Sequence, residues 1–488
     1  MISLRPYQER AVSDVRESFR NGNRRTLLVL PTGGGKTVCF SYISAGVARS
    51  QKRVLIIAHR RELLKQISKT LKQFNIHHSI LDASARGIPR TAVTVASVFT
   101  LASRLKHFPP PDLIIGDEAH HFTPDSTWGK VVAAFPKALV LGVTATPERA
   151  DGKGLGLMFD NMVIGPTVAE LTGMGFLSPA EVYAPPAPDL SRLKVRAGDY
   201  AVGELEKLMG ESSVTGDAVR HYMELCPGKK AVAFCVSVKH AEQVAASFSA
   251  SGVAAASIDG SMETARRDGI LRDFEAGKIA VLCSCDLISE GFDLPAVEAA
   301  ILLRPTKSLA LYLQQVGRVL RIAPGKTHCL VLDHVNNTRV HGFIDDERDW
   351  QLTTDTARKK KPKEEEAESV RTCPKCFAAH RPEPVCPKCG HVYEVKARQV
   401  KQVEGTLEKL ERGEKKEKGP VDWQQQYYAL KKVAERRGQK EPSKWALNIV
   451  MSNEARRLAG KRDVFGQPMI NGLTASERQR IREAIGHG

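Results

Sequence analysis

The chain has 488 residues, of which 42% are hydrophobic and 26% charged, so it can bury several cores and is not a disordered polymer. At ~100–200 residues per domain, this length accommodates about three domains. Apolar runs such as 54–58 and 231–236 are far shorter than the roughly 20 residues of a membrane span. The N-terminal segment lacks the apolar core of a signal peptide. We therefore expect a cytosolic protein without a membrane partner.

The formal net charge is +17, and its excess is concentrated near the C-terminus. Residues 351–488 contain 30 Lys and Arg against 19 Asp and Glu, a net of 30 − 19 = +11. Clustered cations attract polyanions and release their counterions, so nucleic acid is the natural partner. A solvated basic surface is the alternative interpretation of the same charge.

Residues 1–165 alternate between short apolar runs and helical stretches, which predicts strands near 27–30, 54–58, 92–96, 113–115 and 138–142. Strands that alternate with helices indicate a parallel sheet covered on both faces. Residues 166–226 are less regular and include a proline-rich stretch at 184–188, so we expect a linker or subdomain there. A second α/β domain is expected over residues 227–346.

Four further segments are expected after the second α/β domain. Residues 347–370 form a charge-segregated linker, because basic residues at 358–363 precede three glutamates. Residues 371–394 contain paired cysteines, and residues 395–420 are a charged helical or mobile linker. Residues 421–488 predict a small basic helical domain.

A phosphate-binding loop is predicted between the first strand and the following helix. The residues are Pro31, Thr32, Gly33, Gly34, Gly35, Lys36 and Thr37. Glycines let backbone N–H groups point at phosphate oxygens, while the lysine reaches the β- and γ-phosphates and Thr37 ligates Mg²⁺. Leu30 stands where the pattern usually has its first glycine. A glycine-rich turn that only caps a helix is the alternative.

An acidic pair follows the predicted strand at 113–115. Asp117 and Glu118 begin the sequence Asp-Glu-Ala-His. Two carboxylates at a buried strand end are costly unless they meet a cation or transfer a proton. Asp117 can hold Mg²⁺, and Glu118 can orient and deprotonate the attacking water. The alternative is a solvated acidic turn.

The chain resembles superfamily 2 DEAD/DEAH-box helicases over about residues 1–345. The resemblance lies in motifs that occur in the expected order, at residues 4–8, 31–37, 58–63, 94–97, 117–120, 143–147, 234–238, 283–293 and 314–321. It implies two tandem RecA-like domains that close around ATP.

The resemblance also implies roles for single residues. Arg5 and Gln8 would recognise the adenine, and Gly291 and Asp293 would connect the ATP cleft to the strand-binding surface. Backbone contacts to nucleic acid would come from Arg60, Thr94, Ser97 and Ser237.

The last motif contains Gln314, Arg318 and Arg321, whose spacing of four and three residues predicts one shared helical face. Such a face could be an ordinary solvated surface. Opposite a γ-phosphate, the two guanidiniums would neutralise transition-state charge, as arginine fingers do. Their position on the second domain would make hydrolysis depend on closure of the two domains.

Two Cys-x-x-Cys pairs, Cys373 with Cys376 and Cys386 with Cys389, predict a tetrahedral Zn²⁺ site. Redox-active thiols are the main alternative, and His380 or His391 could replace one ligand. The metal would fold a segment too short to have its own core. The six remaining cysteines are expected to be buried thiols.

The stretch at 303–330 and the cysteines placed after the second domain are similar to RadD-like bacterial and phage helicases. This resemblance implies a bacterial or phage-infected cytosol and action on single-stranded or branched DNA in repair, recombination or replication. It leaves open whether a replication or repair protein binds the C-terminal region. An RNA helicase and a nucleotide-gated DNA-binding adaptor that does not unwind are the alternatives.

Overall fold

The computed structural model describes residues 3–147, 154–185, 195–196, 199–200, 202–209, 212–285, 297–352, 370–393, 422–436, 441–458 and 475–486. The chain forms two compact units, residues 1–396 and 397–488. Within the described ranges, no helix combines the length and the apolar character needed to span a bilayer.

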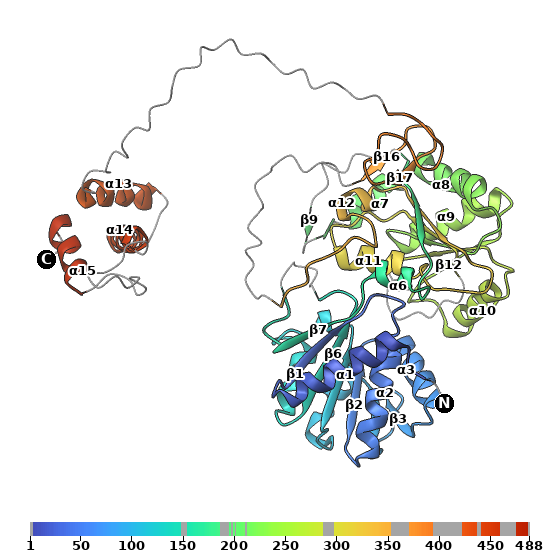
Figure 1. The fold of residues 1–488 in the computed structure, drawn as a ribbon, viewed down its shortest axis with the longest axis horizontal. Coiled ribbons are helices and arrows are strands. Elements are labelled where there is room, and N and C mark those ends of the chain that lie inside the picture. Colours follow the sequence, from blue (N-terminus) through green and yellow to red (C-terminus); the bar gives the residue numbers. More distant parts are fainter. Residues whose placement is uncertain are drawn as a thin grey trace, which may run out of the picture. The chain divides into compact units, whose positions relative to one another are not determined.

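The first lobe is built on a seven-stranded sheet in the order β3-β4-β2-β5-β6-β1-β7, in which every neighbouring pair is parallel (Figure 1). Its strands are β1 (Arg25–Val29), β2 (Val54–Ala58), β3 (His78–Leu81), β4 (Val93–Ser97), β5 (Leu113–Asp117), β6 (Leu139–Thr144) and β7 (Asn161–Ile164).

Helices cover both faces of this sheet, so its central strands are apolar throughout. In β2, Ile56 packs with the core beneath the first three helices, whereas Leu55 and Ile57 pack with the opposite core. The first group is α1 (Pro6–Arg20), α2 (Lys36–Arg49) and α3 (Arg61–Gln73); the second comprises α4 (Val98–Ala102), η1 (Leu105–His107), η2 (Ala119–His121) and α5 (Thr127–Ala134).

The second lobe is built on an eight-stranded sheet in the order β12-β13-β11-β14-β15-β8-β17-β16. The first six strands are parallel, and the last two pair antiparallel. They are β8 (Ala180–Tyr183), β11 (Ala231–Phe234), β12 (Ala255–Ile258), β13 (Val281–Ser284), β14 (Ala299–Leu302), β15 (Cys329–Asp333), β16 (Arg371–Thr372) and β17 (Ala378–His380).

Helices and a small hairpin complete the second lobe. Serine side chains cap two of its helices, because Ser237 accepts a hydrogen bond from the His240 amide and Ser308 from the Leu311 amide. The elements are α6 (Val168–Gly173), α7 (Val202–Met209), α8 (Ser212–Leu225), α9 (Val238–Ala250), α10 (Thr264–Glu275), α11 (Leu309–Gly317), α12 (Asn337–His341), β9 (Val195–Arg196) and β10 (Asp199–Tyr200).

Two segments contribute strands to the sheet of the second lobe, which the sequence did not indicate. Residues 166–226 were expected to be a linker or subdomain, yet they supply β8 to the middle of the second sheet. The cysteine segment supplies β16 and β17 to the same sheet (Figure 1). Strands of two to four residues carry too weak a pattern to show which sheet they join.

The second compact unit contains α13 (Trp423–Arg436), α14 (Pro442–Leu458) and α15 (Ala475–Ile485). Its small core is formed by buried residues of all three helices, namely Tyr427, Ala446, Val450, Ile481 and Ile485. A helical C-terminal region therefore follows the two parallel-sheet domains.

Candidate nucleotide site and metal centre

The phosphate-binding loop connects β1 to α2. Gly33 and Gly35 have φ angles of 87° and 80°, a left-handed conformation that glycine adopts without strain. A β-carbon at Gly35 would also overlap the Gln8 side chain. The first N–H groups of α2 have no acceptor within the helix, so they are available to phosphate oxygens.

Lys36 is a half-buried cation in the first turn of α2. Its Nζ donates a hydrogen bond to the Leu30 carbonyl at 3.3 Å. Burial lowers the pKa of Lys36, whereas Glu118 and Asp117 favour its charged form and Arg318 and Arg321 oppose it. Two acids and three cations therefore act on one another in this site, which suits an anionic ligand accompanied by a cation.

Asp117 ends β5, and Glu118 follows it in the left-handed region, with φ 54° and ψ 56°. The two residues are only 4% and 7% exposed. Burial, reinforced by the neighbouring Glu118 carboxylate, raises the pKa of Asp117 to about 7. A non-glycine residue in this conformation is strained, which is common where side chains are held for function. The buried carboxylates fit a hard divalent cation.

The second lobe meets this site through α11 and the residues that follow it. Gln314 Nε2 donates a hydrogen bond to Glu118 Oε2 at 3.4 Å. Gly317 lies against Thr32 so closely that any side chain there would overlap the threonine. The predicted nucleotide residues of both lobes line one cavity: Thr32, Gly33, Gly35, Lys36, Thr37, Asp117, Glu118, Arg318 and Arg321.

The two arginines do not share a helical face as their spacing predicted. The helix α11 ends at Gly317, Arg318 is its C-terminal cap, and Arg321 lies beyond it. Arg321 pairs instead with Leu177 in an isolated antiparallel bridge. The arginines reach the same cavity because the chain bends after α11.

The two residues predicted to recognise adenine lie beside the loop. Gln8 Nε2 donates to the Gly34 carbonyl at 3.4 Å, and its Oε1 accepts from the Arg5 amide at 3.0 Å. The Arg5 guanidinium lies 4.5 Å from the ring centre of Phe176. Phe176 also packs against Tyr7, with ring centres 5.2 Å apart. An aromatic and cationic cluster therefore adjoins the phosphate loop.

The predicted nucleic-acid contacts are not all at the surface. Arg60 and Ser97 are half-buried and precede α3 and α4, at the carboxyl ends of β2 and β4. Thr94 is 3% exposed within β4, so its side chain cannot contact a nucleic-acid strand bound at the surface. Ser237 caps α9 and donates to Glu206 Oε1 at 2.7 Å. Gly291 and Asp293 lie outside the described residues.

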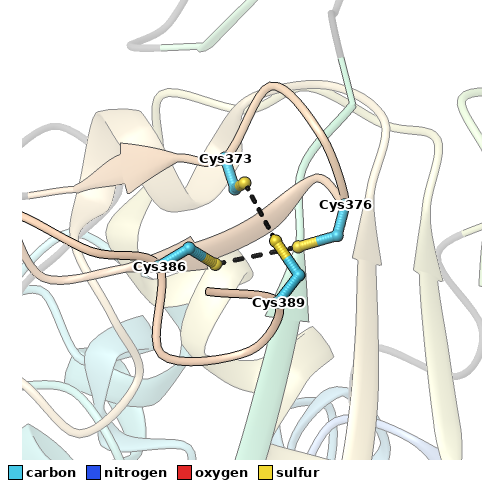
Figure 2. A group of neighbouring side chains, drawn as sticks. All are labelled: Cys373, Cys376, Cys386 and Cys389. Atoms are coloured by element: carbon cyan, nitrogen blue, oxygen red, sulfur yellow. Dashed lines mark hydrogen bonds between the residues drawn. The ribbon is translucent and has the colours of Figure 1, made fainter. Parts of the chain in front are cut away.

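The four cysteines at 373–389 form one cluster (Figure 2). The Sγ atoms of Cys373 and Cys389 are 3.6 Å apart, those of Cys376 and Cys386 are 3.8 Å apart, and all four lie within 4.8 Å of one another. Tetrahedral Zn²⁺ with Zn–S bonds of about 2.3 Å separates its sulfurs by about 3.8 Å. The cluster therefore fits a zinc ion, and the distances are too long for disulfides of about 2.05 Å.

The two halves of the cluster have the same backbone geometry. Phe377 and Gly390 follow the second cysteine of each pair, with φ 56° and 70°, and each amide donates to the carbonyl of the first cysteine. His380 is hydrogen-bonded through both ring nitrogens, to the Arg381 carbonyl and the Tyr393 hydroxyl, each at 2.7 Å. Its nitrogens are thus occupied, which leaves the four thiols as the ligand set.

The cysteine module is attached to the second lobe by more than its strand pairing. The Ala184 amide donates to the Phe377 carbonyl at 2.9 Å. Lys388 forms an ion pair with Glu181 of β8 at 2.7 Å, and Arg381 pairs with Asp346 at 2.8 Å. The module is therefore an extension of the second sheet.

Comparison with known proteins places this architecture in a family. Residues 1–149 match the family model of the type III restriction enzyme res subunit, and residues 216–323 match the helicase conserved C-terminal domain. A 51.5 kDa protein of a Lactococcus phage is 34% identical over 384 residues, which cover 78% of this chain and 81% of that protein. The chain belongs to the superfamily 2 helicases.

A further relative and a solved structure are also similar to this helicase. The putative ATP-dependent helicase IRC3 of Saccharomyces cerevisiae is 31% identical over 361 residues, 69% of this chain, although the match spans only 52% of IRC3. A fragment of a putative HsdR subunit of a type I restriction enzyme from Vibrio vulnificus has the same fold, with a TM-score of 0.56 and 22% identity, over 70% of this chain and 65% of that one. Members of these families hydrolyse ATP, so the helicase is an ATP-hydrolysing enzyme.

Sequence reasoning missed two contributors to the helicase cleft. Phe176 lies in the irregular segment after α6, where no motif marks a ring that returns to the loop. Arg267 of α10 forms an ion pair with Glu62 of α3 across the lobes, with a nitrogen–oxygen distance of 2.9 Å. Each is a single residue without a local pattern, so only the folded chain shows its partner.

Proposed function

We propose that this helicase uses ATP to translocate along DNA and to unwind or remodel it, with branched DNA as a substrate. The observation that carries the proposal is the single cavity lined by Lys36, Asp117 and Glu118 from one lobe and by Arg318 and Arg321 from the other. The match to restriction-enzyme subunits and the net charge of +17 favour DNA as the polyanion.

Each residue of the cleft has a task in hydrolysis. Lys36 and the amides of the phosphate loop bind the β- and γ-phosphates, while the Arg5–Phe176 pair and Gln8 contact the adenine. Thr37 and Asp117 would hold Mg²⁺, which supplies neutralising charge to the phosphates. Glu118, Arg318 and Arg321 act on the reacting atoms.

Glu118 orients the attacking water and accepts its proton, and the Gln314 amide fixes that carboxylate. Arg318 and Arg321 neutralise charge that develops on the γ-phosphate. Because Glu118 and the arginines come from different lobes, hydrolysis requires that the lobes meet. Release of the products then allows the lobes to separate.

Separation and closure of the lobes would move a bound nucleic-acid strand. Arg60 and Ser97 on the first lobe and Ser237 on the second are candidates for backbone contacts, and Glu206 must release Ser237 for that purpose. Backbone contacts carry no sequence information, which suits an enzyme that steps along any sequence. The zinc module and the basic C-terminal region provide further DNA or protein contacts, consistent with repair, recombination or replication.

The decisive experiment compares stimulation of ATP hydrolysis by single-stranded DNA, branched DNA and RNA of matched length. We expect DNA to stimulate turnover more than RNA, branched DNA to be unwound, and Lys36→Ala to lower turnover at least about a hundredfold, since it removes a phosphate-binding charge. Stimulation by RNA alone would assign the enzyme to RNA. Nucleotide-dependent DNA binding without strand displacement would identify an adaptor.

A further inference from the structure

The segment that carries Arg321 follows α11 through a turn in which the Val319 amide still donates to the Val316 carbonyl at 3.1 Å. It leaves α11 at Gly317, and its backbone is fixed on one side by the residues after α6. The Ser178 amide donates to the Leu320 carbonyl at 2.7 Å, beside the bridge between Leu177 and Arg321. The Ser178 hydroxyl also donates to the Arg321 carbonyl at 3.4 Å. This bond is long, so the carbonyls of Val319 and Arg321 can accept from a further group.

Lys326 supplies that group. The sequence Ala323-Pro-Gly-Lys326 forms a tight turn in which the Lys326 amide donates to the Ala323 carbonyl at 3.1 Å. Gly325 has φ 77°, and proline followed by such a glycine is typical of a type II turn. The turn directs the lysine side chain back onto the segment it has just left.

The Lys326 ammonium donates to three backbone carbonyls. Two belong to Val319 and Arg321, the latter at 2.8 Å, and the third belongs to Val297, also at 2.8 Å. An ammonium group has three donors, so all of them are used on the backbone. Val297 is the residue at which the described chain resumes after 286–296, the range that contains Gly291 and Asp293.

This arrangement differs from that of an ordinary surface lysine. Lys326 is half-buried, and none of its three acceptors is a carboxylate. Two of its acceptors flank Leu320, whose own carbonyl is held by Ser178 from the other side. The backbone from Val319 to Arg321 is thus fixed on both sides, and the Arg321 side chain leaves it toward the cavity that contains Lys36.

We propose that Lys326 is a positioning residue for Arg321: it holds the backbone of residues 319–321 so that the guanidinium meets the γ-phosphate. The inference rests on the proposed role of Arg321 in hydrolysis. Because its three donors are used on backbone carbonyls, Lys326 acts on hydrolysis through the arginine. It also links residues 319–321 to Val297.

The test compares Lys326→Met, which keeps the side-chain length without its donors, with Arg321→Ala, the double variant and Lys326→Arg. A misplaced catalytic group can cost up to about a hundredfold in rate, so we expect Lys326→Met to lower kcat about ten- to a hundredfold. The KM for ATP should stay within about twofold. Lys326→Arg restores donors and should recover most of the rate. Lys230→Met is the matched control, because Lys230 donates to the Glu275 carbonyl at 2.7 Å outside the cavity.

The double variant provides the signature of action through Arg321. Once Arg321 is alanine, Lys326→Met should lower kcat no further, because the guanidinium to be positioned is gone. A further fall in the double variant, or a lowered unfolding temperature with normal kcat in Lys326→Met, would overturn the proposal. A normal kcat in Arg321→Ala would overturn the hydrolytic role of the arginine and this inference with it.

Discussion

At the scale of single residues, three histidines of the second lobe are buried without charge. Burial lowers the pKa of His240 to about 4 and, with a contribution from His221, that of His334 to about 3; burial also lowers the pKa of His221. His240 Nδ1 accepts a hydrogen bond from the Val236 amide at 3.3 Å, which requires that nitrogen to be unprotonated. His221 and His334 stack with ring centres 5.2 Å apart. A proton on either ring would be poorly solvated.

These histidines predict a loss of stability in mild acid. The unfolded chain takes up protons near pH 6.5, whereas the folded rings do so only near pH 4 or below, so stability is full above about pH 6.5 and falls as the pH drops. We expect His334→Phe to reduce the change of the unfolding free energy with pH by up to about 1.4 kcal/mol per pH unit. Thermal unfolding between pH 7.5 and pH 5 measures it, with the exposed His77→Phe as control. Equal slopes for wild type and His334→Phe would contradict the assignment.

At the scale of elements, the cysteine module contributes two strands to the second sheet, and its four thiols would hold a zinc ion. We expect Cys386→Ser to lose the zinc. The unfolding temperature of the second lobe should fall by about 5 °C or more, because β17 would no longer pair with β8. Metal analysis and thermal unfolding measure the two effects. The exposed, non-ligating Lys375→Ser provides the control within the same pair. Loss of metal without loss of stability would show that the strands fold without it.

Much of the site at this scale could be predicted from the sequence, because local patterns mark it. The phosphate loop, the Asp117–Glu118 pair and the four-cysteine cluster each occupy a short stretch whose chemistry depends on spacing. The helical face expected for Arg318 and Arg321 was wrong, because α11 ends at Gly317 and spacing alone does not show where a helix stops. Thr94 was predicted to contact nucleic acid, although its side chain is buried within the first lobe. β8 and Phe176 depend on pairing between distant segments, which no local pattern records.

At the scale of the whole molecule, an ion pair between Arg267 and Glu62 joins the two lobes. Arg267 and Glu62 have side chains only 12% and 20% exposed, so breaking the pair leaves a poorly solvated charge. We expect Arg267→Glu or Glu62→Arg to lower kcat/KM for ATP about five- to tenfold, because each opposes closure of the lobes.

Exchange of the two charges should restore kcat/KM to within about twofold, as expected of residues in contact. Steady-state ATP hydrolysis by the four combinations measures the coupling. Arg220→Glu offers a control, since Arg220 pairs with Asp217 within one lobe and both side chains are more than half exposed. Independent effects of the two substitutions would exclude a role for this contact in closure.

The position of β8 between β15 and β17 has a consequence for biosynthesis. β8 leaves the ribosome long before either neighbour, since its pairing partners lie at residues 329–332 and 378–379. Until both have been translated, the nascent chain carries a segment of this sheet whose two edges are unpaired, and such edges invite association with other chains. The second lobe therefore completes its sheet only after almost four-fifths of the polypeptide has been made.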